Sequence, residues 1–473
     1  MKKGEMVEGV ITKVRYPNKG MMTGKNSAGE EALCCVKNTV PGQRVLARTG
    51  KKKSGAIDAQ LIEVIAKAPD ETKPPCPLFG SCGGCTYLNL PYDRECALKE
   101  QQVRELLASA MREAGAEEDL SWFEGIKGSP RIYEYRNKME FSFGDSAKDG
   151  PLELGMHRRG SFYDVQTADC CVIVDEDYRR IVHAVRSYFA ERKTPYFHRG
   201  THEGYLRHLL VRKAARTSEI LVDLITAPAD SALAGAEEEL LSGFRDVILS
   251  LKTDGVITGI LHTVNSAVSD IVRDDGTDVL YGQDFFTEKL LGLSFKVTPF
   301  SFFQTNTESA EVLYGTVREY LRDFFAGCEA PLVYDLYCGT GTITQLAAEN
   351  ARKVIGVEIV EEAVRAAREN ARENGIENCE FLAGDVLKVL DQIEEKPDLL
   401  ILDPPRDGIH PKAMPKILSY GVEQILYISC KPTSLARDLP FFYAAGYRAV
   451  RGMCLDQFPW TTGVETVCLL SNR

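Results

Sequence analysis

The sequence has no long apolar run. Every hydrophobic stretch is shorter than the roughly 18–20 residues that a helix needs to cross a membrane, which argues against a membrane protein. The first residues, MKKGEMVEGVITKV, also lack the apolar segment of a secretion signal. We therefore expect a cytoplasmic protein, in a compartment where thiols stay reduced.

Disulfides are not expected in that compartment, so the fourteen cysteines need another explanation. Reduced cysteines in this number indicate metal or nucleophilic chemistry. The chain of 473 residues is too long for one hydrophobic core, so two or three domains are expected. A hydrophobic content of 44% and a charged content of 26% are ordinary for a globular protein.

The net charge of −11 gives little reason to expect a nucleic-acid partner, but the charge is unevenly distributed. Residues 1–53 hold twelve Lys and Arg against four Asp and Glu, a net charge of +8 that leaves −19 for the rest. A basic arm on an acidic body is typical of an attached nucleic-acid-binding module. A solvated charged face is the alternative.

Residues 4–66 read as four or five short strands punctuated by glycines. This spacing, with its basic loops, predicts a small OB-like β-barrel over residues 1–67. Barrels of this kind bind single-stranded or irregular RNA through a positive groove.

A proline-rich linker then leads into the segment PPCPLFGSCGGC. Cys76, Cys82 and Cys85 have the spacing C-x5-C-x2-C, with glycines that let a loop wrap closely around an inorganic centre. An iron–sulfur cluster or an all-cysteine zinc site needs four thiolates. The fourth could come from the pair Cys170-Cys171 or, less readily, from Cys96 in a helix-like segment.

The region 68–285 mixes helix and strand signals, so we expect a central α+β domain that bears the cysteine loop. Residues 92–115 have the apolar spacing of an amphipathic helix, which could pack on the C-terminal domain. Strand-like segments at 131–144, 152–165 and 204–217 interleave basic and aromatic residues. Such aromatics can stack on unpaired bases, although on alternating strands they more often form the core.

From about residue 290 the pattern changes to repeated strand–helix units, which predicts an α/β domain over 286–473. Alternating units of this kind form a Rossmann-like, doubly wound parallel sheet. The predicted strands are Pro331–Tyr337, Lys353–Glu358, Glu380–Asp385, Asp398–Asp403, Gln424–Ser429, Tyr447–Leu455 and Thr466–Ser471.

The segment DLYCGTGTIT (335–344) joins the first of these strands to a helix. Gly339 and Gly341 allow a tight turn, but neither the full G-x-G-x-x-G nor a Walker lysine is present, so phosphate binding is disfavoured. Asp335, Glu358 and Asp385 lie at successive strand ends. Acids in these positions suit a positively charged nucleoside, which is the pattern of S-adenosylmethionine-dependent methyltransferases.

The fourth and fifth strands end in DPPRDG and in SCKPTSLARDL. In related methyltransferases an Asp-Pro-Pro segment at this strand end faces the target base, and Asp403–Pro405 is the corresponding segment here. Arg406 stands where amine-methylating enzymes carry an aromatic residue, so amine methylation is disfavoured. Cys430 lies where a strand meets a loop, at the sheet edge that binds ligands, and is a candidate nucleophile. Taken alone, a cysteine in this position is more often a buried structural thiol.

Together these motifs resemble those of the RNA uracil-C5 methyltransferases, most closely the 23S rRNA type that carries an iron–sulfur cluster. The resemblance covers nearly the whole chain. Residues 1–65 are similar to a TRAM domain, and PPCPLFGSCGGC is similar to the cluster loop of the family. Two positions depart from the pattern, since Gly463 replaces a usual His and Leu88 stands where Gln is common.

The resemblance implies a role for each matching residue. Cys430 would be the nucleophile and Glu465 the general base, while Asp403, Arg406 and Phe141 would contact the uracil. A [4Fe–4S] cluster would be held by Cys76, Cys82, Cys85 and Cys171, with Cys170 as the alternative to Cys171. S-adenosylmethionine would contact Gln304, Asp335, Tyr337, Gly339, Gly341, Glu358, Asp385 and Asp403.

The expected activity is methyl transfer from S-adenosylmethionine to C5 of a uridine in RNA, with 23S rRNA as the leading substrate. A tRNA uracil-C5 methyltransferase is one alternative. An inactive RNA-binding or ribosome-assembly factor is another, which the intact set of motif residues disfavours. No membrane and no obligate protein partner are expected.

Overall fold

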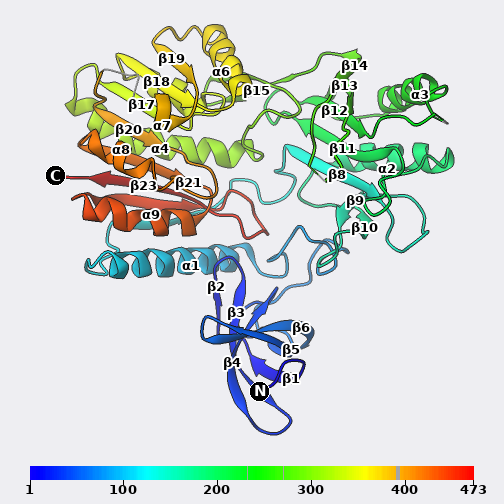
Figure 1. Ribbon diagram of the computed structural model, residues 1–473, viewed down its shortest axis with the longest axis horizontal. Helices are drawn as coiled ribbons and strands as arrows, with labels where there is room; N and C mark the ends of the chain where they lie inside the picture. Colours follow the sequence, from blue (N-terminus) through cyan, green and yellow to red (C-terminus); the bar gives the residue numbers. More distant parts are fainter. Residues whose placement is uncertain (232, 270, 390–394) are drawn as a thin grey trace. The chain divides into compact units, whose positions relative to one another are not determined.

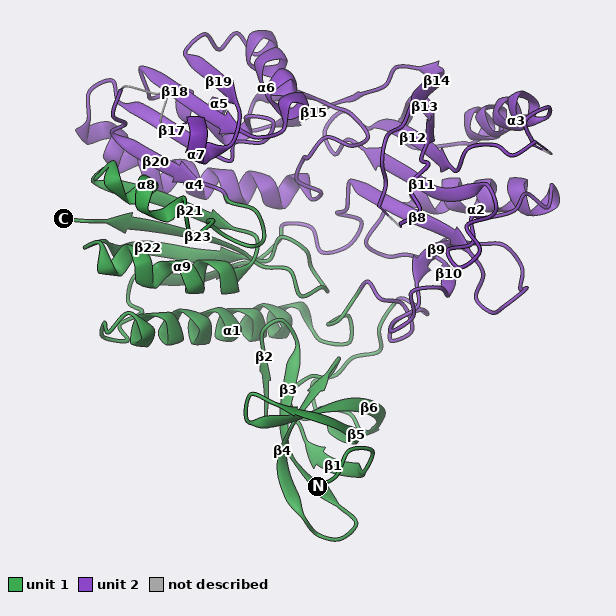
Figure 2. Ribbon diagram, in the orientation of Figure 1, with its two compact units in different colours: residues 1–75, 85–129, 404–473 green, residues 76–84, 130–403 purple. Residues whose placement is uncertain are grey.

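The structure is a computed structural model that describes residues 1–231, 233–269, 271–389 and 395–473 (Figure 1). Its contacts divide the chain into two compact units (Figure 2). Unit 1 contains residues 1–75, 85–129 and 404–473, and unit 2 contains residues 76–84 and 130–403. The predicted domains 1–67, 68–285 and 286–473 stay a prediction, because the two units are built from discontinuous segments. None of the described helices is long and apolar enough to span a membrane.

Unit 1 begins with a six-stranded β-barrel. Its strands are β1 (Met6–Val10), β2 (Lys13–Arg15), β3 (Lys19–Asn26), β4 (Glu31–Lys37), β5 (Arg44–Lys53) and β6 (Ala56–Ala66). They follow the order β1-β5-β6-β4-β3-β2, and β1 also pairs with β3, which closes the barrel. Val7, Met22 and Val36 lie in its core. The predicted N-terminal barrel is therefore confirmed.

The rest of unit 1 combines helices with the C-terminal strands. These elements are α1 (Tyr92–Glu113), β7 (Phe123–Lys127), α8 (Met414–Ser419), β21 (Gln424–Ser429), α9 (Pro432–Ala444), β22 (Arg448–Leu455) and β23 (Glu465–Ser471). Helix α1 contacts α9, and β7 pairs in parallel with β22. Strand β23 runs antiparallel to β21 and β22, so the all-parallel prediction is wrong there. The link 456–464 is too short for a parallel crossover, which needs about a dozen residues or more.

A buried group of charges ties α1 to this link. Lys99 Nζ lies 2.7 Å from Glu95 and 2.6 Å from Asp456, and all three side chains are fully buried. Glu95 also accepts a hydrogen bond of 2.7 Å from the backbone nitrogen of Trp460. These contacts fix the segment that leads into β23.

Unit 2 contains a seven-stranded sheet in the order β10-β9-β8-β11-β12-β13-β14. The strands are β8 (Lys138–Gly144), β9 (Glu153–His157), β10 (Val165–Thr167), β11 (Leu206–Lys213), β12 (Glu219–Thr226), β13 (Val256–Val264) and β14 (Thr277–Gly282). Helices α2 (Glu176–Glu191) and α3 (Glu237–Ser250) pack on this sheet. Phe189 joins the layers, with its ring 5.8 Å from Phe143 and 6.0 Å from Phe244.

Unit 2 also contains four parallel strands in the order β19-β18-β17-β20. The elements here are β15 (Phe286–Leu290), β16 (Leu293–Val297), α4 (Thr307–Gly327), β17 (Leu332–Leu336), α5 (Thr342–Ala348), β18 (Lys353–Glu358), α6 (Glu361–Glu373), β19 (Cys379–Ala383), α7 (Val386–Val389) and β20 (Leu399–Leu402). The predicted strand–helix alternation is confirmed here. The strand order reverses between β17 and β20, and α/β sheets bind ligands at such a point.

Candidate active site

The glycine turn after β17 leaves room for a ligand. Gly339 and Gly341 have φ angles of 55° and 77°, which favour glycine. A Cβ on Gly341 would lie 2.6 Å from the ring of Phe381, so this glycine permits close packing. A Cβ on Gly339 would meet nothing nearer than Phe302 Cδ1 at 4.0 Å. The space beside Gly339 is therefore open to a bound molecule. Tyr337, in the same turn, has a φ of 69°.

Three of the predicted acids gather around this turn. Glu358 accepts hydrogen bonds from the backbone nitrogens of Gly339 (3.1 Å) and Val360 (3.0 Å). Asp403 follows β20, and its nitrogen donates to the Leu336 carbonyl at 3.3 Å. Asp385 follows Gly384, whose nitrogen donates to the Glu358 carbonyl at 2.9 Å. Unit 2 thus brings the carboxylates of the second, third and fourth strand ends to one edge.

Asp335 has a different environment from the other acids. Its side chain is fully buried and accepts a hydrogen bond of 2.6 Å from Thr344 Oγ1, which joins β17 to α5. Burial raises the pKa of Asp335 to about 7. Its Oδ1 has no hydrogen-bond partner among the described residues and has no accessible surface.

The loop that carries Gln304 lies against the same turn. Thr340 Oγ1 donates to the Phe302 carbonyl at 3.4 Å. The Gln304 carbonyl accepts a hydrogen bond of 2.9 Å from Asn137 Nδ2, and this bond holds the loop to the start of β8. The loop that carries Gln304 therefore contacts the glycine turn through Phe302, within unit 2.

Within unit 1, Cys430 and Glu465 lie at the same end of two paired strands. The ladder between β21 and β23 ends at the pair Ser429 and Thr466, and Thr466 Oγ1 donates to the Ser429 carbonyl at 3.2 Å. Cys430 and Glu465 are the next residues beyond this pair. Helix α9 begins two residues after Cys430, and the partial positive charge at a helix N-terminus favours a thiolate.

Glu465 is buried, whereas its neighbour Arg406 is exposed. Only 3% of Glu465 is accessible to solvent. Burial raises the pKa of Glu465 to about 7, although the charge of Arg406 acts to lower it. The Arg406 carbonyl accepts a hydrogen bond of 2.6 Å from Ser434 Oγ in α9. A carboxyl group with a pKa near neutrality is suited to act as a general base.

Tyr16, in the barrel, is a residue that the sequence did not identify. Its hydroxyl is close enough to Arg406, Cys430 and Glu465 for their charges to affect its pKa, which burial raises to about 12. Tyr16 therefore stays neutral and able to donate a hydrogen bond. Residues on both sides of Tyr16 are anchored, since the Pro17 carbonyl accepts a hydrogen bond of 2.8 Å from the hydroxyl of Tyr87 and the Val14 carbonyl accepts one from Gln102.

Phe141 does not have the role that was predicted for it. Its side chain has no solvent exposure, because it lies in the interior strand β8 and pairs with Leu209 of β11. A ring without accessible surface cannot stack on an RNA base. The prediction that Phe141 contacts the uracil is therefore wrong.

The thiols of unit 2 that were predicted as cluster ligands lie close together. The Cys76 side chain forms a hydrogen bond with Cys170, and Cys76 is also close to Cys82 and Cys171. Burial raises the pKa of Cys171 to about 11, while the backbone nitrogens of Ile173 and Val174 donate to its sulfur. Cys82 Sγ accepts a similar bond of 3.4 Å from the Gly84 nitrogen.

The four predicted cluster ligands come from both units. Among the residues that the structure describes, no group of three or more His, Cys, Asp or Glu side chains is arranged to hold a metal ion. The predicted ligand Cys85 belongs to unit 1, whereas Cys76, Cys82 and Cys171 belong to unit 2.

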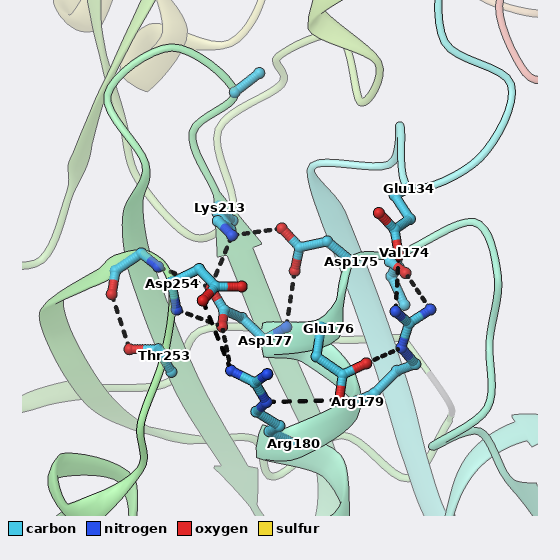
Figure 3. A network of polar contacts seen from close by, with 12 residues as sticks. Glu134, Val174, Asp175, Glu176, Asp177, Arg179, Arg180, Lys213, Thr253 and Asp254 are labelled. Atoms are coloured by element: carbon cyan, nitrogen blue, oxygen red, sulfur yellow. Dashed lines mark hydrogen bonds and ion pairs between the residues drawn. The ribbon is translucent and has the colours of Figure 1, made fainter.

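A polar network supports the segment that contains Cys171 (Figure 3). Arg179 donates to the Cys171 carbonyl at 3.2 Å and to Glu134 at 2.7 Å. Lys213, at the end of β11, forms ion pairs with Asp175 and Asp177 at the start of α2. The backbone around Cys171 is therefore bound to α2, and the start of α2 is bound to β11.

Comparison with known proteins assigns the family. Residues 332–440 match the family model described as a methyltransferase domain. The chain is 44% identical over 476 residues to a Clostridium tetani protein named uncharacterized RNA methyltransferase, covering 100% of this chain and 99% of the relative. A Clostridium acetobutylicum protein described in the same words is 43% identical, with the same coverage. The chain belongs to the RNA methyltransferases.

A solved structure has the same fold as this RNA methyltransferase. It is the tRNA (uracil-54, C5)-methyltransferase of Pyrococcus abyssi in complex with S-adenosyl-L-homocysteine. The TM-score is 0.74, and the alignment covers 98% of this chain and 100% of that chain at 24% sequence identity. Identity at this level is evidence for a common fold only.

Proposed function

We propose that this RNA methyltransferase transfers a methyl group from S-adenosylmethionine to C5 of a uridine in RNA, with 23S rRNA as its substrate. The observation that carries the proposal is the placement of Cys430 and the buried Glu465 at adjacent ends of β21 and β23. C5 of uracil is a poor nucleophile, so the reaction needs both a thiolate that activates the ring and a base that removes the C5 proton.

Cys430 begins the reaction in this proposal. Its thiolate adds to C6 of the uracil, and the electron pair of the C5–C6 bond moves into an enolate that includes C5. S-adenosylmethionine, when bound, supplies an electrophilic methyl carbon. C5 of the enolate would bond to that methyl carbon as the methyl–sulfur bond breaks, and the electron pair of that bond would stay on the sulfur of the departing S-adenosylhomocysteine. The α9 N-terminus beside Cys430 supports the thiolate on which this step depends.

Glu465 completes the reaction. Its carboxylate takes the proton from C5, the electrons of the broken C–H bond restore the C5–C6 double bond, and the Cys430 thiolate leaves C6. Arg406 keeps part of Glu465 ionised, because its positive charge lowers the pKa that burial raises. Asp403 is the proposed hydrogen-bonding partner of the uracil edge, and Tyr16 supplies a neutral donor close to Cys430.

The residues around the glycine turn suit S-adenosylmethionine. The open space beside Gly339 would admit the nucleoside, and the Glu358 carboxylate lies where it could accept hydrogen bonds from ribose hydroxyls. Asp335 belongs to the proposed set as the acid that precedes this turn, where it is fully buried and joins β17 to α5 through Thr344. Gln304, Tyr337, Gly341, Asp385 and Asp403 complete the proposed set of contacts.

RNA that contains 5-fluorouridine at the target position tests the mechanism. A fluorine at C5 cannot be removed as a proton, so the Cys430 adduct should accumulate and survive denaturing electrophoresis. The Cys430→Ala variant should form no adduct, and Cys35→Ser, which changes a thiol in the barrel, should behave as the unchanged enzyme. Adduct formation by Cys430→Ala would exclude Cys430 as the nucleophile.

Undermodified 23S rRNA and tRNA should be compared in the same reaction. We expect 5-methyluridine in the rRNA, and modification of the tRNA alone would favour the tRNA alternative. An inactive assembly factor would bind RNA without consuming S-adenosylmethionine.

We also propose a [4Fe–4S] cluster held by Cys76, Cys82, Cys85 and Cys171. The support is the sequence spacing together with the N–H···S bonds to Cys82 and Cys171, which stabilise thiolates. Protein purified without oxygen should be brown and contain iron. Cys171→Ser should lose the colour while Cys170→Ser keeps it. A colourless protein loaded with zinc would contradict the cluster.

A further inference from the structure

The turn between β9 and β10 exposes two neighbouring aromatic rings. Phe162 is 80% exposed and Tyr163 is 66% exposed. Among the other aromatic side chains of the described residues, only Phe302, in the loop beside the glycine turn, is exposed to a similar extent, at 68%. Large exposed apolar groups cost free energy in water unless they are covered by a partner. Neither ring takes part in the chemistry proposed above.

Hydrogen bonds shape this turn, which comprises residues 158–164. The Arg158 nitrogen donates to the Asp164 carbonyl at 2.8 Å, and the Ser161 nitrogen donates to the Arg158 carbonyl at 3.0 Å. Ser161 Oγ accepts hydrogen bonds from the nitrogens of Tyr163 (3.2 Å) and Asp164 (3.1 Å). The rings are thus presented by a defined backbone, which lowers the entropy cost of binding.

Three arginines lie in this turn or contact its backbone. Arg199 donates to the Phe162 carbonyl at 2.7 Å and contacts His157 at 2.8 Å. Arg159 donates to the Cys82 carbonyl at 3.3 Å, and Arg158 is exposed. These contacts hold the guanidinium groups of Arg159 and Arg199 at fixed positions beside the turn.

The cysteine loop of unit 2 supports the same turn. The Gly83 nitrogen donates to the His157 carbonyl at 3.1 Å, and the Arg159 nitrogen donates to the Ser81 carbonyl at 2.6 Å. Cys82 and Arg158 form an antiparallel β-bridge. Any centre that fixes the cysteine loop would therefore also fix the turn.

We infer that the 158–164 turn is a binding surface for unpaired bases of the RNA substrate. Phe162 and Tyr163 stack on two bases, and Arg158, Arg159 and Arg199 contact the adjacent phosphates. Every base offers a face for stacking, whereas the bases of a duplex are already stacked and its groove does not admit such rings. The inference rests on the proposed function only in taking RNA as the partner.

Binding of a short fluorescent single-stranded RNA to the full-length protein tests this surface. The variants Phe162→Ala and Tyr163→Ala should each weaken binding by about tenfold, since stacking on one aromatic side chain is commonly worth this much. Phe441→Ala, which removes a half-exposed ring from α9, is the matched control and should bind as the unchanged protein. A duplex of the same sequence should bind with little dependence on either ring.

The dependence of affinity on salt separates the arginines from the rings. Arg158→Gln should lower the slope of log K against log salt by about 0.7, the value for one phosphate contact on a single strand. Phe162→Ala should leave this slope unchanged, and so should Arg322→Gln, which removes an exposed charge of α4. If Phe162→Ala and Arg158→Gln both lower the slope of log K against log salt, the turn has unfolded in both variants. That result would contradict the inference that Phe162 binds RNA by stacking on a base.

Failure of this inference can be told apart from failure of the proposed function. If the enzyme makes 5-methyluridine but Phe162→Ala and Tyr163→Ala bind RNA as well as it does, the inference is wrong and the function stands. If both variants lose single-stranded RNA while the unchanged protein makes no 5-methyluridine, the surface is supported and the uracil-C5 reaction is not.

Discussion

At the scale of single residues, Glu465 holds the central place because its burial determines its chemistry. A carboxyl group in water is ionised at neutral pH, whereas burial brings the pKa of Glu465 to about 7. The deprotonated fraction therefore changes within the physiological range, and in the proposed mechanism that fraction sets how fast the C5 proton is removed.

The breakdown of the RNA adduct should accordingly depend on pH. Only the ionised form of Glu465 can accept the proton, so the rate should rise with pH and level off above about 7. Glu465→Gln should lack this rise and accumulate adduct, with turnover reduced at least about a hundredfold, the usual contribution of a general base. Single-turnover kinetics across a pH series would measure it, and rapid turnover by Glu465→Gln would exclude this residue as the base.

Arg406 should influence the position of that pH dependence. Its charge lowers the pKa of Glu465, so Arg406→Gln should raise this pKa and move the rise in rate to higher pH. Arg437→Gln, which removes another half-exposed arginine of unit 1, provides the comparison. A curve for Arg406→Gln that coincides with the unchanged enzyme would show that the two groups are not coupled.

At the scale of elements, the buried ion group of Lys99, Glu95 and Asp456 should contribute to the stability of unit 1. Burial lowers the pKa of Lys99, but Asp456 and Glu95 raise it more, so the net shift is upward and the amine stays charged. Lys99→Met would leave two carboxylates buried without their cation. We expect it to reduce the free energy of unfolding by about 3–5 kcal/mol, which denaturant titration would show.

Two further variants would complete that measurement. Adding Glu95→Gln and Asp456→Asn to Lys99→Met should recover much of the loss, because no buried charge then remains unpaired. Arg318→Met, which breaks an exposed ion pair with Glu349, should cost less than about 1 kcal/mol. A loss of similar size in Lys99→Met and Arg318→Met would contradict the account of the buried group.

Several elements could be predicted from sequence, since their signals are local. Strands β18 and β21 have the predicted ranges, because each is a short apolar run bounded by turn residues. The antiparallel direction of β23 could not be predicted by assuming strand–helix alternation throughout. The pairing of β7 with β22 joins segments more than 300 residues apart, and no local pattern records it.

The candidate site shows the same limit. Cys430, Glu358 and Asp403 could be proposed because each lies at or just beyond the end of a recognisable strand. Tyr16 could not, because its approach to Cys430 depends on how the barrel packs against α1. Phe141 and Phe162 look alike in an aromatic and basic sequence, and only the folded chain distinguishes the buried ring from the exposed one.

At the scale of the whole molecule, the uneven charge predicts how RNA binding depends on salt. Lys51, Lys52 and Lys53 are exposed where β5 turns into β6, within the segment that carries a net charge of +8. Changing all three to Gln should lower the slope of log K against log salt by up to about 2, at about 0.7 for each phosphate contact. The affinity should fall equally for different RNA sequences. An unchanged slope, with unchanged unfolding, would show that this part of the barrel does not contact RNA.

The central claim is that methylation occurs at C5 of uridine, and the release of tritium tests it most directly. Substrate RNA labelled with tritium at C5 of its uridines should release one tritium to water for each methyl group that it gains. Cys430→Ala should give neither product. Methyl incorporation without release of tritium would place the new methyl group on another atom and would contradict the account.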